Sequence, residues 1–195
     1  MSTEKYIYNQ INENFTKRYL RVTSVLYPFS GLHNIDSDVV AHAAERGTRV
    51  HKICESIVMG FGEFGVDDEV KPYVESFKKW WGAGKQVVMM EKRFFCDEID
   101  ISGQVDLIIR EDDKLTIIDL KTSYKPSKTW AAQASAYYHL ATQAGHDIEA
   151  IKFIHLSKTG RTPKIYEYPC SSSFFLAVLM VFKHFFMESE DGKTV

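Results

Sequence analysis

The chain of 195 residues contains little cysteine, and its three cysteines are not arranged as partners. Cys54, Cys96 and Cys170 are odd in number, lie far apart and form no Cys-x-x-Cys pair. This pattern argues against a disulfide framework, a cysteine-bound zinc site and an iron–sulfur cluster. The first residues, MSTEKYIYNQ, also lack the apolar segment of a secretory signal peptide. We therefore expect a reducing, intracellular environment and a protein that is not secreted.

The sequence also lacks an apolar run long enough to cross a membrane. Its most apolar stretch, SFFLAVLMVFKHFFM, falls short of the ~20 residues that a span requires, and Lys183 and His184 interrupt it. This segment is expected to be a buried helix or an oligomer interface. Internal repeats, low-complexity segments and interdomain linkers are absent as well. We therefore expect a single domain over residues 1–195, with a helical N-terminal portion up to about residue 85.

No charge predominates overall, because the net charge is −2, but the charges are unevenly distributed. The window from Lys121 to Lys164 holds seven basic and two acidic residues, a charge of +5, which leaves −7 for the remainder. Such asymmetry suits an anionic partner on one side of the molecule, although a charged run is often only a solvated surface. The basic residues are Lys121, Lys125, Lys128, Lys152, Lys158, Arg161 and Lys164.

Hydrophobic periodicity predicts the order helix, helix, three strands, helix, two strands, helix. Helices are expected over about 36–60, 68–81, 128–144 and 173–187, and strands over 87–96, 102–123 (as a hairpin), 150–156 and 164–168. This order indicates an α/β fold with a central mixed β-sheet flanked by helices. The 68–81 helix alternates aromatic residues with lysines, which suits either a core-facing amphipathic helix, the reading we favour, or base stacking.

The stretch SGQVDLIIREDDKLTIIDLKTS (102–123) organises the prediction of a site. It consists of two apolar runs joined by a charged turn, and each run contains one carboxylate, Asp106 and Asp119. If Asp112-Asp113 forms a two-residue turn, paired residue numbers sum to 225, so the two aspartates lie opposite each other. Like charges in that arrangement are destabilising, so a positive group should lie between them. A divalent cation and Lys121, two residues after Asp119, would supply it.

The burial pattern of this hairpin supports a functional role for the two aspartates. An incidental pair on a solvent-facing sheet would have a polar face, but both faces here are apolar. A buried charge must be paired or bind a metal. Val105, Leu107, Ile109, Ile118 and Leu120 are expected on one face, and Ile108 and Ile117 flank the aspartates on the other.

Two further residues are candidates for the same site. His51 lies on the 36–60 helix one turn after Gly47, whose small size would allow close approach of another segment. A lone helical histidine is more often structural, but neutral imidazole is also a good metal ligand. Glu91, among apolar residues of the 87–96 strand, would be a second-shell carboxylate, a ligand for a second metal or the partner of a basic neighbour. Glu55, one turn after His51, is a further second-shell candidate.

Four short motifs in this order resemble the RecB-like branch of the PD-(D/E)XK nucleases. They are Gly47-Thr-Arg-Val-His51, Gly103-Gln-Val-Asp106, Ile118-Asp119-Leu120-Lys121 and Gln133-Ala-Ser-Ala-Tyr137. The resemblance spans about residues 40–140 and implies a restriction-endonuclease-like core. The chain is also similar to mitochondrial genome maintenance exonucleases and small phage nucleases. It lacks the four cysteines of relatives that carry an iron–sulfur cluster.

The resemblance implies a role for each matched position. His51, Asp106, Asp119 and the main-chain carbonyl of Leu120 would bind Mg²⁺ or Mn²⁺. Lys121 would orient and activate the attacking water, so that Lys121, Asp119 and Asp106 form the catalytic set. Gln133 and Tyr137 would position DNA and support the site. The +5 window offers Lys125, Lys128, Lys158 and Arg161 as phosphate contacts.

The function implied is a metal-dependent DNA nuclease, an exonuclease of DNA replication, recombination or repair that leaves 5′-phosphates. It would act on single- or double-stranded ends in the cytoplasm or another intracellular compartment that contains DNA, as a monomer or a homo-oligomer. Two alternatives stay open. One is a catalytically weak module that binds DNA ends or a protein partner, and the other is a nuclease that acts on RNA.

Overall fold

The computed structural model describes residues 19–82 and 84–187. The elements in chain order are β1 (Leu20–Arg21), α2 (Val22–Leu26), the 3₁₀ turns η1 (Tyr27–Phe29) and η2 (Leu32–Asn34), α3 (Ser37–Val58), α4 (Lys71–Trp80), β2 (Gln86–Cys96), β3 (Ile101–Glu111), β4 (Lys114–Lys121), α5 (Trp130–Gln143), β5 (Ala150–His155), β6 (Lys164–Tyr168) and α6 (Ser173–Phe186). The helices and strands predicted between residues 36 and 187 are confirmed. Strand β1 is an addition, and α2 lies within the N-terminal portion expected to be helical, of which residues 1–18 fall outside the described residues.

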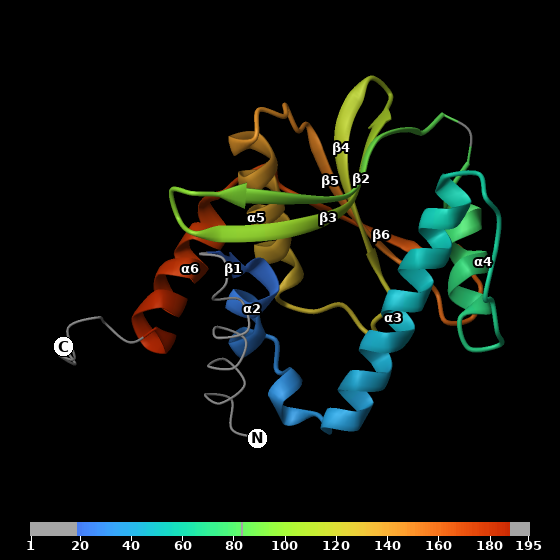
Figure 1. Cartoon of the computed structure of the whole chain (residues 1–195), viewed down its shortest axis with the longest axis horizontal. Coiled ribbons are helices and arrows are strands. Elements are labelled where there is room, and N and C mark those ends of the chain that lie inside the picture. Colours follow the sequence, from blue (N-terminus) through green and yellow to red (C-terminus); the bar gives the residue numbers. More distant parts are fainter. Residues whose placement is uncertain (1–18, 83, 188–195) are drawn as a thin grey trace.

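A six-stranded mixed sheet forms the centre of the molecule (Figure 1). Strands β2, β3 and β4 pair antiparallel in chain order, β4 and β5 pair parallel, and β6 pairs antiparallel with β5. The parallel step requires a crossover connection, which α5 provides. This arrangement confirms the predicted α/β fold with a mixed sheet flanked by helices.

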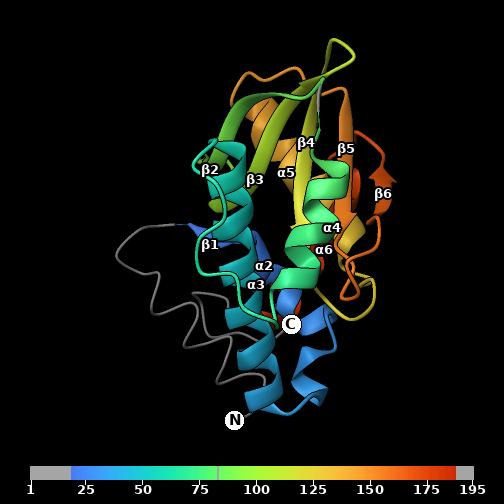
Figure 2. The same cartoon turned by 90° about the vertical axis from the view of Figure 1, so that its right-hand side faces the viewer.

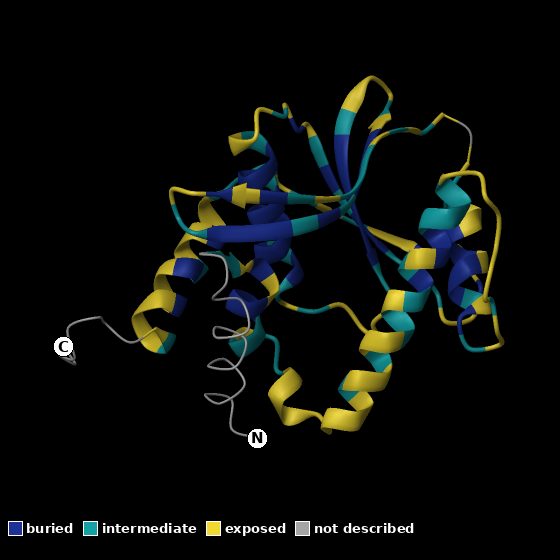
Figure 3. Ribbon diagram, in the orientation of Figure 1, coloured by how far each residue is buried: buried dark blue, intermediate teal, exposed yellow. Residues whose placement is uncertain are grey.

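Helices cover both faces of the sheet, as the two apolar faces of the hairpin predicted (Figure 2). One core cluster joins the sheet to α2, α5 and α6 and includes Ile108 and Ile117. The other joins it to α3 and α4 and includes Leu107 and Ile118. Val105 was expected beside Leu107 but packs in the α5 cluster, because β3 has already separated from β4 at this point. Figure 3 shows the buried residues concentrated in the sheet and α5, whereas the first half of α3 is exposed.

Strand β3 has one edge that two strands share. Strand β2 pairs along nearly its whole length, whereas β1 pairs with Ile101 and Ser102 and β4 pairs only from Leu107 onward. Among the described strands, none therefore pairs with this edge at residues 103–106. The gap lies where the predicted Gly103-Gln-Val-Asp106 motif is located.

The aromatic residues of α4 belong to the core, as favoured above: Tyr73 and Phe77 are buried. Helix α6 buries Phe175, Leu179 and Phe182 and half-buries Val178 and Phe186, whereas Met180 and Phe185 are each 71% exposed. Of the two alternatives given for this segment, burial therefore holds for one stripe of the helix only, and the oligomer interface stays a prediction. None of the helices in the described ranges is long and apolar enough to span a membrane.

Candidate active site

The hairpin has the predicted register, and its turn explains why. All ladder pairs between β3 and β4 sum to 225, from Glu111–Lys114 to Leu107–Ile118. Asp112 and Asp113 have φ values of 51° and 60°, the left-handed conformation that a two-residue type I′ turn requires and that aspartate tolerates. The ladder stops one pair before Asp106 and Asp119 would meet. Instead, the Asp106 carboxylate accepts a hydrogen bond from Leu120 N at 2.6 Å and occupies the gap between the strands.

Helix α3 places His51 over this gap. Asp36 caps the helix by accepting hydrogen bonds from Asp38 N and Val39 N, and Gly47 lies so close to β4 that an added Cβ would be 3.2 Å from Thr122 Oγ1. His51 Nδ1 is 3.3 Å from Asp106 Oδ1, and Nε2 donates to the Leu120 carbonyl at 3.0 Å. Burial disfavours the charged imidazole, but Asp106 and Asp119 together raise the pKa of His51 to about 9. The predicted approach of helix and hairpin is therefore present.

Glu91 is the third acidic residue in the gap. In the β2–β3 register it lies opposite Asp106, between the pairs Met90–Leu107 and Lys92–Val105, but its φ of 47° interrupts the ladder. Such a conformation costs about 1–3 kcal/mol for a residue with a side chain, and it persists where surrounding contacts enforce it. One potential ligand atom each from His51, Glu91 and Asp106 lie within 4.8 Å of one another.

Gln104 holds the Glu91 carboxylate in place. Its Nε2 donates to Glu91 Oε2 at 2.5 Å, and its Oε1 accepts from Arg93 Nη2 at 2.7 Å. The amide orientation is thereby fixed, because Arg93 can only donate. Burial raises the pKa of Glu91, whereas the Gln104 hydrogen bond opposes this. Sequence reasoning did not single out Gln104 or Arg93, although Gln104 lies inside the predicted motif.

Asp119 and Lys121 form a second group on the α5 side of the sheet. Asp119 is 3% exposed, and its Oδ2 is 2.7 Å from Lys121 Nζ. Lys121 also donates to Gln133 Oε1 at 2.8 Å, and Gln133 donates to the Tyr137 hydroxyl at 2.8 Å. Burial and the nearby Asp106 charge raise the pKa of Asp119 to about 6, against the opposing effect of Lys121. The predicted Gln133 therefore contacts Lys121 directly, and Tyr137 acts on Lys121 through Gln133.

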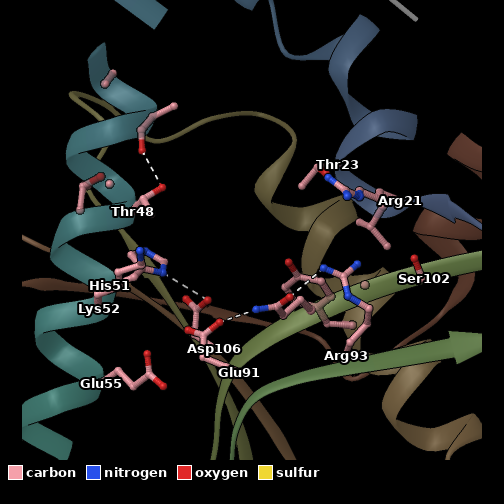
Figure 4. Close-up of a pocket in the computed structure, with 18 residues that line it drawn as sticks. Arg21, Thr23, Thr48, His51, Lys52, Glu55, Glu91, Arg93, Ser102 and Asp106 are labelled. Carbon is pink, nitrogen blue, oxygen red and sulfur yellow. Dashed lines mark hydrogen bonds and ion pairs between the residues drawn. The ribbon is translucent and has the colours of Figure 1, made fainter. Parts of the chain in front are cut away.

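A cavity of about 770 Å³ opens beside these groups, and its two walls differ in charge (Figure 4). His51, Glu55, Glu91 and Asp106 line one wall. Arg21, Thr23, Arg93 and Ser102 line the other, where β1 and β2 flank the start of β3. Gly103 lies in the floor, and a Cβ there would be 2.7 Å from Leu140 Cδ1. The motif glycine is therefore required by packing against α5.

Comparison with protein families identifies the central part of this structure. Residues 65–161 match the model of the PD-(D/E)XK nuclease superfamily. Residues 65–161 are therefore similar to a PD-(D/E)XK nuclease superfamily domain. The matched range includes Glu91, Asp106, Asp119 and Lys121 and begins after His51. The gap between β3 and β4 therefore lies within the matched part of the chain.

Solved structures show a similar fold. A protein described as "putative exonuclease" from Eubacterium rectale superposes with a TM-score of 0.53 at 13% identity, covering 94% of this chain and 82% of that chain. A second structure, of the protein SSO0001, gives a TM-score of 0.48 at 18% identity, with 92% of this chain and 84% of that chain covered. No curated protein sequence matches the chain. At these identities the likeness concerns the fold.

A divalent metal ion is typical of PD-(D/E)XK nucleases, and the residues in the gap fit one. His51, Glu91 and Asp106 supply an imidazole nitrogen and two carboxylates at ligand spacing, a donor set that suits Mg²⁺ or Mn²⁺. Asp119 Oδ2 is buried and lies 2.7 Å from Lys121 Nζ, and an ionised carboxylate has further lone pairs with which it can also bind a cation. The described cysteines are isolated, with no cluster among them.

The structure arranges the predicted site residues differently from the sequence expectation in two respects. Glu91 joins His51 and Asp106 in the compact group, whereas Asp119 lies beside Lys121. The Leu120 carbonyl, predicted as a metal ligand, accepts a hydrogen bond from His51. The predicted phosphate contacts Lys125, Lys128, Lys158 and Arg161 are all exposed and lie outside the compact group. Glu55 lines the cavity wall, one turn after His51.

Proposed function

We propose that this PD-(D/E)XK domain is a metal-dependent DNA nuclease that hydrolyses phosphodiester bonds and leaves 5′-phosphates. The observation that carries the proposal is the convergence of His51, Glu91 and Asp106 on one point, with the Asp119–Lys121 pair on the adjoining strand. Imidazole and carboxylates at this spacing suit a divalent ion, and an adjacent ammonium suits a phosphate substrate. The cavity on the substrate side accommodates a polar ligand because both of its walls are charged.

His51, Asp106, Asp119 and Glu91 are the proposed metal ligands. The Nε2 hydrogen bond to Leu120 fixes the imidazole orientation and leaves Nδ1 facing Asp106, so Nδ1 is the nitrogen available to a cation. When bound, the metal would polarise the scissile phosphate and lower the pKa of a coordinated water. The backbone N–H of Leu120 orients Asp106, and the backbone carbonyl of Leu120 orients His51.

Lys121 is proposed to stabilise negative charge on the phosphate and to orient the attacking water. Its ammonium is fixed by Asp119 and Gln133 and packs 4.8 Å from the centroid of the Phe153 ring. A charge held in place in this way needs little reorganisation when negative charge develops. Tyr137 fixes the Gln133 amide, so the α5 pair acts on the reaction through Lys121.

The finer assignment is an exonuclease of the RecB-like branch that acts on DNA ends in replication, recombination or repair. This assignment rests on the resemblance of the four short motifs and on the fold shared with the Eubacterium rectale protein. Exposed Lys125, Lys128, Lys158 and Arg161 are the proposed contacts to the DNA backbone.

End-labelled linear single- and double-stranded DNA, a closed circle and RNA test the proposal, each with Mg²⁺, Mn²⁺ or EDTA. We expect metal-dependent degradation of linear DNA, with the closed circle intact. Lys121→Ala and Asp119→Asn should reduce the rate at least 100-fold. The controls are Lys114→Ala at the other end of β4 and Asp113→Asn in the hairpin turn, and both should keep the wild-type rate.

Melting curves must show that the two site variants are folded. Activity unchanged in both of them would overturn the assigned site. Robust DNA binding without cleavage in any metal would replace the nuclease by a binding module, and cleavage of RNA alone would change the substrate class.

A further inference from the structure

We propose that Tyr124, together with Lys158, forms a stacking platform for an unpaired nucleobase next to the catalytic cavity. The proposal rests on the nuclease function above and specifies the substrate form, a single strand at this position. Tyr124 is 81% exposed and follows the catalytic strand β4 by three residues, in the loop that leads to α5. Lys158 Nζ, from the turn between β5 and β6, lies 4.3 Å from the centroid of its ring.

Hydrogen bonds fix the two backbone segments that carry Tyr124 and Lys158. His155 Nε2 donates to the Ser123 carbonyl at 2.6 Å, and Ser123 Oγ donates to the Lys125 carbonyl at 2.9 Å, which ties the loop on both sides of Tyr124. The opposite turn is tied to α4, because Ser157 N donates to Ser76 Oγ at 2.9 Å and Lys79 Nζ donates to the Gly160 carbonyl at 2.6 Å. The Tyr124 ring and the Lys158 ammonium are thus exposed to solvent on two segments whose backbone is fixed by hydrogen bonds.

The position of the ring relative to the cavity fits the next nucleotide of a bound strand. Thr122 lines the cavity and is 8% exposed, and Tyr124 is two residues further along. Two residues of extended chain span at most about 7 Å. A strand whose phosphate lies at the cavity would therefore bring a neighbouring base within reach of the Tyr124 ring.

The chemistry of the pair selects a base with a neighbouring phosphate. An exposed aromatic ring stacks on any base, whereas bases inside a duplex already have both faces covered by their neighbours. The Lys158 ammonium lies over one face of the ring, so a base would stack on the other face, and its positive charge suits the phosphate of the same nucleotide. The two side chains together therefore favour a single-stranded segment over a blunt duplex.

Fluorescence anisotropy in EDTA, with a labelled oligo(dT) and a blunt duplex of equal length, tests the platform without cleavage. Tyr124→Ala should weaken binding of the single strand by about 5- to 150-fold, the range for loss of one stacked base. Tyr124→Phe should stay within about twofold of wild type. Binding of the duplex should change less than about twofold. The matched control is Phe185→Ala, an exposed aromatic on α6, which should bind like wild type.

A second readout separates stacking from a general effect on the loop. An oligonucleotide series with 2-aminopurine at successive positions should show one position whose fluorescence is quenched by wild type and Tyr124→Phe but not by Tyr124→Ala. An abasic site at that position should remove the difference in affinity between wild type and Tyr124→Ala.

Equal single-strand affinity of wild type and Tyr124→Ala, in a protein that binds and cleaves DNA, would overturn the platform and leave the nuclease proposal intact. Equal losses for single strand and duplex would also overturn it, because they indicate a contact that does not depend on unpaired bases. A protein that binds neither probe would overturn both proposals.

Discussion

At the scale of single residues, the candidate site is a set of charges that constrain one another. His51 and Asp106 face each other at 3.3 Å, while Asp106 receives the Leu120 N–H and His51 donates to the Leu120 carbonyl. One peptide segment thereby orients both an acid and a base. A proton on His51 Nδ1 occupies the position that a metal ion would take, so the metal-free protein retains its order through this ion pair.

The ion pair predicts how the stability of the metal-free protein depends on pH. The pKa of His51 is raised from 6.5 to about 9 in the folded state, because burial, which lowers it, is outweighed by the Asp106 charge, the Asp106 hydrogen bond and the Asp119 charge together. The contribution is therefore fully present below pH 6.5 and is lost as the pH rises through 9. We expect the free energy of unfolding in EDTA to fall by roughly 1–3 kcal/mol between these values.

Chemical denaturation at a series of pH values in EDTA measures this loss. His51→Gln should flatten the profile between pH 6.5 and 9, whereas His33→Gln, an exposed histidine of η2, should leave it unchanged. A profile of the same shape for His51→Gln and wild type would contradict the proposed ion pair.

The contact between Gln104 and Glu91 predicts an effect on metal affinity. Gln104 fixes a carboxylate whose backbone is in an unfavourable conformation, so its removal frees Glu91 to leave the metal position. We expect Gln104→Ala to weaken Mn²⁺ binding by about 10- to 100-fold, the usual effect of losing a residue that orients a ligand. Isothermal titration calorimetry with Mn²⁺ measures it directly.

Gln86→Ala, at the exposed start of β2, is the control and should bind Mn²⁺ like wild type. Gln104→Glu should also lose affinity, since it replaces the donating amide with a second negative charge. Unchanged affinity in Gln104→Ala would show that Glu91 is held without it, or that Glu91 is not a ligand.

At the scale of helices and strands, the parts that sequence reasoning predicted depend on local rules. The turn Asp112-Asp113 sets the register of the hairpin, and alternation of apolar residues sets its buried faces, so both follow from neighbouring residues. The separation of β3 from β4 before Leu107 does not follow from neighbouring residues, because it depends on β1 pairing with the same edge of β3. Glu91 enters the site only through this separation and its own left-handed conformation. The sequence alone therefore does not decide between the three roles considered for Glu91.

The edge that β1 and β4 share also explains why Gly103 is required. The strand passes so close to α5 and α2 that an added Cβ would be 2.7 Å from Leu140 Cδ1, 3.1 Å from Tyr137 Cε1 and 3.2 Å from Val22 Cγ2. We expect Gly103→Ala to lower the free energy of unfolding by about 1–3 kcal/mol, the usual cost of overpacking a core. It should also impair catalysis, because Tyr137 supports Lys121 through Gln133.

Urea denaturation of Gly103→Ala against Gly82→Ala separates this packing effect from a general effect of alanine. Gly82 has no atoms within 4 Å of an added Cβ and no positive φ, so its substitution should be neutral or slightly stabilising. Equal stability of the two variants would show that α5 can move away from β3 at little cost.

At the scale of the whole molecule, fewer basic residues are available to an anionic ligand than the +5 charge of the window from Lys121 to Lys164 suggested. Lys121 belongs to the site, and Lys152 pairs with Glu111 at 2.8 Å, so neither is free for a distant ligand. Of the other five, Lys164 is exposed at the start of β6, and the four predicted phosphate contacts, Lys125, Lys128, Lys158 and Arg161, are exposed on the segments that follow β4 and β5. Sequence counts cannot separate paired from free charges, because the pairing depends on which strands become neighbours.

These four free charges predict the salt dependence of DNA binding. Each basic residue that neutralises a phosphate adds about 0.7 to the slope of log affinity against log salt for single strands and about 0.9 for duplex DNA. Lys128→Ala and Arg161→Ala should each weaken binding without sequence preference and reduce the slope by about that amount. Lys114→Ala, at the far end of β4, should leave both quantities unchanged. Anisotropy titrations between 50 and 200 mM salt measure affinity and slope together. A weaker affinity with an unchanged slope would mean that the lysine or arginine acts by packing, because a lost phosphate contact must release fewer ions.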